Sequence, residues 1–288
     1  MPIIFDHVYH TYSVKSPVEY AALKDISLSI KDHSFTALIG QTGSGKSTLA
    51  QHINALLIPT QGSVDVNGFL INNGKKKIKK IKDLRKKVGL VFQFPEYQLF
   101  EETVLKDVLF GPKNFGVDEQ EALRNAKEAL NLVSIPERYW DKSPFELSGG
   151  QRRRVAIAGI ITLRPEILIL DEPTAGLDPK GAQEMMDLFK EIHKQGTTIV
   201  MVSHDMNNVL TYCSDVVVLK DGKVSMTGTP IDLFKDDEKL KEVSIEEPIV
   251  LSFAKKLIKQ GRDICLDNVK DVKSLAEEIK KGKVIHND

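Results

Sequence analysis

The hydrophobic residues of this chain gather in short uninterrupted runs, and stretches with a helical period separate those runs. A run of roughly four to eight apolar residues is typical of a strand buried on both faces of a parallel sheet. Such runs occur at 35–40, 88–92, 166–171 and 197–203. Helical periodicity lies between or beside them, at 47–57, 118–133 and 180–195. This alternation predicts an α/β fold in which helices cover a largely parallel sheet.

The two ends of the chain follow other patterns. Residues 3–30 alternate between apolar and polar positions, which predicts an antiparallel β-subdomain at the N-terminus. Two β-type runs flank Asp221-Gly222, and this dipeptide is typical of a tight hairpin turn. Further on, amphipathic helices ending near a glycine are expected at 249–261 and 272–282.

These patterns predict a main domain, residues 1–228, followed by a C-terminal helical extension, residues 229–288. The 40 basic and 40 acidic residues cancel, so no overall charge favours nucleic acid as a partner. Cys213 and Cys265 lie far apart and lack the spacing of a metal site. No apolar stretch reaches the roughly 18 residues of a membrane-spanning helix, which indicates a cytosolic or peripheral protein.

A glycine-rich loop, GQTGSGKST, stands between the first buried run and the first expected helix. In that position it matches the G-x-x-x-x-G-K-[ST] pattern of phosphate-binding loops. Backbone NH groups surround the phosphates in such a loop, while Lys46 reaches the β and γ phosphates and Ser47 ligates Mg²⁺. The predicted nucleotide-binding residues are Gly40, Gln41, Thr42, Gly43, Ser44, Gly45, Lys46, Ser47 and Thr48.

Polar residues follow the other buried runs, where the carboxyl ends of parallel strands place ligand sites. Asp171 is the candidate magnesium ligand, and its neighbour Glu172 is the candidate base that activates water. Alternatively, these two acids cap the next turn. His204 is a candidate contact for the γ-phosphate. The amide of Gln93 is a candidate to bind magnesium or to orient the attacking water.

A second anion-binding pattern lies in ELSGGQRRRVAIAG, residues 146–159. Two glycines behind a serine lead directly into a basic, apolar-periodic helix, and the NH groups at a helix N-terminus favour phosphate. Arg152, Arg153 and Arg154 are expected to support phosphate binding or subunit contacts. One domain therefore contains two candidate sites for phosphate.

Taken together, these motifs resemble the nucleotide-binding subunit of ATP-binding cassette (ABC) transporters over about residues 1–228. The segments that match in order and spacing are GQTGSGKST, Gln93, LSGGQ (147–151), ILILDE (167–172), AGLD (175–178) and His204. The resemblance implies a P-loop NTPase fold with an N-terminal antiparallel β-subdomain and a helical subdomain. It also implies ATP and Mg²⁺ as cofactors, and head-to-tail dimers that hold each ATP between one phosphate loop and the other subunit's LSGGQ.

The resemblance assigns roles to further residues. The LSGGQ residues that would bind the partner's nucleotide are Ser148, Gly149, Gly150 and Gln151, with Ser148 and Gly150 at its γ-phosphate. Asp178 would cross the dimer interface. Tyr12 would stack on adenine, although Tyr9 and Tyr20 lie nearby on the same subsheet.

A narrower resemblance is to the ATPases of energy-coupling factor transporters, which import vitamins and metal ions into prokaryotes. VGLVFQFPEYQLF, TVLKDVLFGPKNFG and SPFELSGGQRRRVAIAG carry it, and the long segment SVKSPVEYAALKDISL is most similar to the second of two paralogous ATPases. This implies a paralogous ATPase partner in a heterodimer, a transmembrane coupling subunit and, indirectly, a substrate-binding membrane subunit. The chain would lie at the cytoplasmic face of the cell membrane, with its C-terminal extension as a dimerisation module.

Two surface patterns each have two interpretations. The apolar side chains of QFPEYQLF, residues 93–100, either form a groove for helices of a transmembrane subunit or pack into the helical subdomain. The basic run at 75–87 places Ile78, Ile81 and Leu84 at helical spacing. Either this stripe faces the core of the protein, or the basic side chains are attracted to anionic lipid.

Other classes of ATPase remain as alternatives. A conventional ABC importer of metal ions uses the same motifs. DNA-repair ATPases insert a long coiled coil or zinc module before LSGG, whereas about 100 residues without heptads separate the two motifs here. Translation factors with these motifs normally have two cassettes in one chain, and this chain has one.

Overall fold

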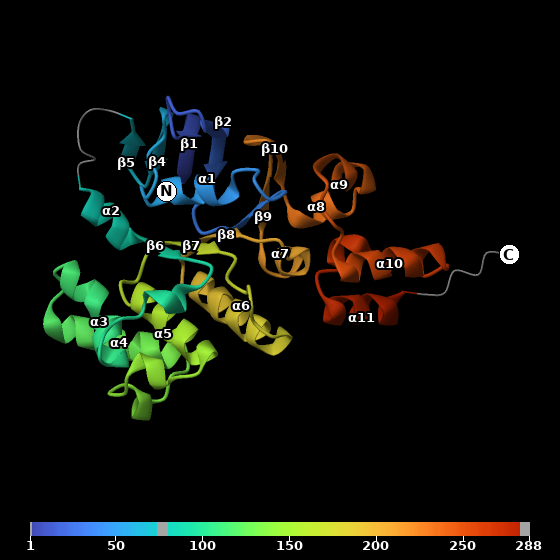
Figure 1. Ribbon diagram of the computed structural model, residues 1–288. Helices are drawn as coiled ribbons and strands as arrows, with labels where there is room; N and C mark the ends of the chain where they lie inside the picture. Colours follow the sequence, from blue (N-terminus) through green and yellow to red (C-terminus); the bar gives the residue numbers. More distant parts are fainter. Residues whose placement is uncertain (1, 74–79, 283–288) are drawn as a thin grey trace.

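The computed structural model describes residues 2–73 and 80–282 and contains two β-sheets (Figure 1). The first sheet has the strand order β2-β1-β4-β5 and is antiparallel throughout. Its strands are β1 (Ile3–Tyr12), β2 (Tyr20–Ile30), β4 (Gln61–Val66) and β5 (Phe69–Asn72). The apolar side of the alternation points inward, since Ile3, Phe5 and Val8 are buried. The predicted N-terminal antiparallel subdomain is therefore confirmed.

The second sheet has the strand order β10-β9-β3-β8-β7-β6. Its strands are β3 (Phe35–Ile39), β6 (Val88–Val91), β7 (Ile167–Asp171), β8 (Thr198–Val202), β9 (Asp215–Lys220) and β10 (Lys223–Gly228). Every pairing is parallel except that of β9 with β10, which form the hairpin predicted at Asp221-Gly222. Both turn residues have positive φ, 52° and 79°, as a two-residue hairpin turn requires.

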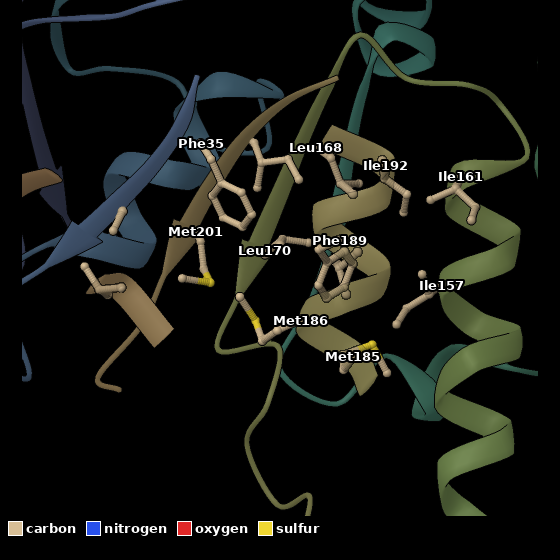
Figure 2. Close-up of a cluster of buried hydrophobic side chains, with 14 of the residues drawn as sticks. Phe35, Ile157, Ile161, Leu168, Leu170, Met185, Met186, Phe189, Ile192 and Met201 are labelled. Atoms are coloured by element: carbon tan, nitrogen blue, oxygen red, sulfur yellow. The ribbon is translucent and has the colours of Figure 1, made fainter. Parts of the chain in front are cut away.

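The helix α6 (Pro179–Lys194) packs its apolar side against this parallel sheet (Figure 2). Met186 and Phe189 lie over Leu168 and Leu170 of β7, and all four side chains are fully buried. Burial of side chains this size contributes about 1.5–3 kcal/mol each. The contact fixes β7, and with it the two acidic residues at its carboxyl end.

Three helices form a separate layer below the parallel sheet in Figure 1: α3 (Val104–Asn114), α4 (Glu119–Leu132) and α5 (Gly149–Ile161). Side-chain caps begin the first two, because Thr103 accepts from Lys106 N and Asp118 accepts from Gln120 N. Ile157 and Ile161 of α5 face α6, which joins this helical subdomain to the sheet.

The described part of the basic run forms one short helix. α2 (Ile81–Lys87) begins after Lys80, and Leu84 is fully buried while Ile81 is half-buried. The described part of the stripe thus faces the core. Residues 75–79, with Ile78, lie outside the described residues.

The C-terminal residues form α8 (Pro230–Phe234), α9 (Asp237–Val243), α10 (Ile249–Lys259) and α11 (Val272–Lys281). α10 and α11 lie side by side, at the positions that the sequence predicts (Figure 1). They attach to α7 (Met206–Tyr212), where Asn207 Oδ1 accepts from Ile249 N at 2.9 Å and Thr211 Oγ1 donates to Lys270 O at 3.0 Å. Within the described residues, no helix combines the length and the apolar content that crossing a bilayer requires.

Candidate active site

The phosphate loop joins β3 to α1 (Lys46–Ile53), as the motif predicts. Gly40 has φ +142°, and a Cβ there would lie 2.1 Å from the carbonyl oxygen of Leu219 on β9. Only glycine fits so close to the neighbouring strand. Gly45 also has positive φ, 101°, and directly precedes α1, so the loop turns its NH groups into the start of a helix.

Lys46 is the buried cation of this loop. Its side chain bends back over the loop and donates to the carbonyl oxygens of Gly40 at 2.8 Å and Gln41 at 2.9 Å. Burial lowers the pKa of Lys46, while the charges of Glu172 and Asp171 act in the opposite direction. A phosphate in the loop offers this ammonium charged acceptors in place of neutral carbonyl groups.

Oxygen atoms that could bind a cation lie next to the loop. Ser47 Oγ donates to Asp171 Oδ1 at 3.1 Å, which brings a helix start and a strand end together. Burial raises the pKa of Asp171, while Ser47 and Lys46 lower it. The described residues contain no cluster of three or more His, Cys, Asp or Glu side chains that could hold a metal. A hydroxyl and one carboxylate nevertheless fit Mg²⁺, which takes its other ligands from water and phosphate.

Glu172 occupies an unusual position directly after β7. Its φ is 50°, in the left-handed region, and its NH donates to Val202 O at 3.0 Å. The side-chain atom Oε1 is buried and lies 3.3 Å from Nε2 of His204, but it has no hydrogen-bond partner among the described residues. Burial, with a smaller contribution from Asp171, raises the pKa of Glu172 to about 6. A partly buried carboxylate with a raised pKa suits a general base.

His204 lies opposite Glu172, where β8 ends. Its side chain is half exposed, and burial, followed by the charge of Lys46, lowers its pKa. The ring is therefore largely neutral at pH 7, and one of its nitrogens can donate a hydrogen bond to a phosphate oxygen.

These groups line one cavity of about 400 Å³ at the carboxyl ends of the strands. The predicted residues that it brings together are Thr42, Gly43, Gly45, Lys46, Ser47, Thr48, Gln93, Asp171, Glu172 and His204. A larger cavity, about 810 Å³, lies near the amino ends of the strands, beside Asp32, Glu166 and Thr197. Because ligands of open parallel sheets bind at the carboxyl ends, the smaller cavity is the candidate site.

The LSGGQ segment, residues 147–151, lies outside this cavity. Ser148 begins α5 in a capping box, in which its Oγ accepts from Gln151 N at 3.3 Å and its NH donates to Gln151 Oε1 at 3.0 Å. Ser148, Gly149 and Gly150 are all exposed. Asp178 is exposed as well and caps α6 by accepting from Gly181 N. Their roles toward a partner's nucleotide stay predictions.

The three aromatic candidates differ in position. Tyr20, not Tyr12, lines the cavity, and its hydroxyl donates to Gly43 O at 2.9 Å. Tyr12 pairs with Tyr20 across the end of the β1–β2 hairpin, and its hydroxyl lies 3.1 Å from Thr48 Oγ1. Tyr9 is half-buried and pairs with Gln61 of β4. The stacking role of Tyr12 stays a prediction.

Arg153 has a structural role that its sequence pattern did not predict. Only 2% of this residue is exposed, so the expectation that it supports phosphate binding or subunit contacts is wrong. Its guanidinium donates to Gln93 O at 2.6 Å, Ala175 O at 2.8 Å and Glu96 Oε2 at 3.2 Å. Arg153 thus links the segment that contains Gln93 and Glu96 to the AGLD segment, residues 175–178. Its spacing of four from Ile157, and of eight from Ile161, could have shown that it faces inward.

Comparison with known proteins identifies the family. The model of the family described as "ABC transporter" matches residues 23–175. This range includes the phosphate loop, the LSGGQ segment and the acidic residues Asp171 and Glu172. The chain belongs to the ABC transporter family. It is an ATP hydrolase of the transport type, as its motifs predict.

Its relatives place this ATPase in the energy-coupling factor branch. The energy-coupling factor transporter ATP-binding protein EcfA2 of Spiroplasma kunkelii is 51% identical over 278 residues, 96% of this chain and 91% of that protein. EcfA2 of Ligilactobacillus salivarius is 55% identical over 249 residues, 86% of each chain. The predicted resemblance to the second paralogue is confirmed.

Solved structures confirm the fold class. CbiO1 from Clostridium perfringens, part of the ABC transporter complex cbiONQ, superposes with a TM-score of 0.73 at 38% identity, covering 89% of this chain and 98% of that one. The ATP-binding cassette MJ0796, as a post-hydrolysis dimer with ADP and Pi, gives a TM-score of 0.70 at 32% identity, covering 79% of this chain and 98% of that one. The ATPase is an α/β cassette with an antiparallel sheet and a helical layer.

Proposed function

We propose that this chain is the second ATPase subunit of an energy-coupling factor importer of vitamins or other micronutrients. The observation that carries the proposal is the similarity to EcfA2 proteins over nearly the whole chain. CbiO1, part of the ABC transporter complex cbiONQ, is a more distant relative at 38% identity. A conventional ABC importer of metal ions, which uses the same motifs, is the second candidate. The chain would be peripheral at the cytoplasmic face of the membrane.

In this function the cavity binds ATP with Mg²⁺. Lys46 and the loop NH groups bind the phosphates, while Ser47, Asp171 and Gln93 supply oxygen atoms near the metal. Magnesium, when bound, neutralises charge that develops on the transferred phosphoryl group. Glu172 accepts the proton of the attacking water, and His204 donates to the γ-phosphate.

A second ATPase completes each site. Ser148 and Asp178 are exposed and lie outside the cavity of their own subunit, which supports a role toward a partner's nucleotide. The partner is a paralogue, by the similarity to the EcfA2 type. Residues 229–288 would then act as a dimerisation module. Their exposed side chains Ile249, Phe253 and Val272 border an apolar groove of about 550 Å³, which supports that role.

The segment 93–100 would couple hydrolysis to a transmembrane subunit. Leu99 is buried, whereas Phe94, Tyr97 and Phe100 are 42%, 84% and 57% exposed. Phe100 also stacks edge-to-face on Phe110 of α3, which is 43% exposed. Adjacent exposed aromatic rings favour a docking surface for helices of the membrane subunit.

The first experiment is purification of the tagged chain from detergent-solubilised membranes of its own organism, followed by identification of its partners by mass spectrometry. We expect a paralogous ATPase and a polytopic membrane protein in stable proportion. Recovery of a homodimer with neither partner, or of DNA or ribosomes, would contradict the proposal.

The docking surface can be tested by the double substitution of Tyr97 and Phe100 by alanine. We expect at least a tenfold loss of copurifying membrane subunit with an unchanged Kd for ATP, because neither residue lines the cavity. The matched control is Leu70→Ala on β5, which changes another exposed side chain (55% exposed) and should leave the complex intact. Retention of the membrane subunit by the double variant would exclude this surface.

A further inference from the structure

Three rings lie in series between β1 and α1: Tyr12, His10 and His52. The ring centroids of Tyr12 and His10 are 4.6 Å apart at 74°, and those of His10 and His52 are 4.8 Å apart at 81°. His52 is fully buried and His10 is 7% exposed, whereas Tyr12 is 37% exposed. The series therefore runs from the core of the protein to its surface beside the phosphate loop.

The hydrogen bonds of this series require His52 to be neutral. Nδ1 of His52 lies 2.7 Å from Thr48 O, and because a carbonyl only accepts, this nitrogen carries the proton. Nδ1 of His10 lies 3.1 Å from Ile58 O and therefore carries a proton too, so Nε2 of His52, 3.2 Å from that nitrogen, is an acceptor. Nδ1 of His10 is thus the donor. Burial lowers the pKa of His52 to about 4 and also lowers that of His10, in agreement with this arrangement.

Thr48 connects the three rings to the nucleotide cavity. The carbonyl of Thr48 accepts from His52, and its hydroxyl lies 3.1 Å from the hydroxyl of Tyr12. Thr48 itself lines the cavity as the last residue of the phosphate loop. The ring of Tyr12 is therefore held on one side by His10 and at its hydroxyl by the loop that binds phosphate.

We propose that His10 is a positioning residue for the base of the nucleotide. It holds the ring of Tyr12 at a set place relative to the phosphate loop, so that the ring is ordered before ATP arrives. The inference rests on the proposed function, in which Tyr12 stacks on adenine. An aromatic ring that must be ordered during binding weakens affinity by about three- to tenfold.

The test compares ATP with tripolyphosphate, which has the phosphates but no base. In the full-length chain, His10→Phe keeps a ring but removes the donor to His52 and Ile58. We expect its Kd for Mg-ATP to rise about three- to tenfold and its Kd for Mg-tripolyphosphate to stay unchanged. His10→Asn keeps a donor and removes the ring. It should likewise raise the Kd for Mg-ATP and leave the Kd for Mg-tripolyphosphate unchanged. It replaces His10→Phe if that variant does not fold.

A double-mutant cycle makes the test decisive. In a Tyr12→Ala background, His10→Phe should have no further effect on ATP affinity, because His10 acts through Tyr12. A loss of tripolyphosphate affinity, or an effect of His10→Phe that persists without Tyr12, would overturn the proposal. Equal ATP affinity of the wild type and Tyr12→Ala would overturn it too, while leaving the ATPase function in place. Failure of the wild type to bind ATP would instead overturn the proposed function.

Discussion

Replacing Glu172 by glutamine is expected to reduce ATP turnover by about 10²- to 10⁴-fold while ATP still binds. The glutamine amide has almost the same shape but cannot take a proton from water. Glu172 follows β7, and its buried Oε1, which has no hydrogen-bond partner in the part of the chain that the structure describes, lies 3.3 Å from His204 Nε2. Lys46 and Ser47, which we propose to bind phosphate and metal, are unchanged in this variant, so we expect binding to be retained.

Single-turnover hydrolysis and equilibrium ATP binding, both in the assembled complex, separate these two effects. Glu242→Gln, an exposed glutamate outside the cavity, is the matched control and should behave as the wild type. Because burial raises the pKa of Glu172 to about 6, wild-type turnover should also decline as pH falls through about 6. Near-normal hydrolysis by Glu172→Gln would remove Glu172 as the base.

Replacing Arg153 by methionine is expected to lower the free energy of unfolding by about 3–5 kcal/mol. The side chains of Arg153 and Glu96 are 3% and 17% exposed, so the substitution leaves a nearly buried carboxylate without its cation. The carbonyl oxygens of Gln93 and Ala175 lose their donor as well. Since Gln93 lines the cavity, ATP turnover should fall together with stability.

Denaturant unfolding and turnover of three variants test this role. Arg154→Met, which removes a partly exposed ion pair with Glu184, should cost only about 0–1 kcal/mol. The double variant Arg153→Met, Glu96→Met should regain much of the lost stability, because no unpaired charge stays buried. It should not regain turnover, since Gln93 O still lacks its donor. An Arg153→Met variant as stable as Arg154→Met would contradict the role given to Arg153.

The periodicity of the sequence was sufficient to place most of the fold. The strand runs at 35–40, 88–92 and 166–171 became β3, β6 and β7, each within about one residue of its predicted end. Hydrophobic burial on both faces leaves such runs few alternatives to a parallel sheet. The basic run at 75–87 was less informative, because its described residues, 80–87, are strongly charged and include one buried residue, Leu84, which specifies the ends of a helix poorly.

The sequence also predicted that side chains from different strands meet in one site. Gln93, Asp171 and His204 each lie at or just after the end of a buried strand, and parallel strands bring their carboxyl ends to the same edge of a sheet. The glycine-rich loop arrives at that edge for the same reason. Residue type and position at the end of a buried strand were therefore enough to predict that these three side chains line one cavity.

Side-chain direction was decided only by the tertiary structure. Arg153 sits in a basic cluster that looks like a surface feature, yet it points into the subunit, because the apolar side of α5 must face the sheet and helices beneath it. Tyr12 and Tyr20 are equivalent in sequence, but the register of the β1–β2 hairpin places Tyr20 in the cavity and Tyr12 against His10. Local patterns determine which segments become strands and helices. Contacts between segments distant in sequence determine where each side chain points, because they form only when the layers pack.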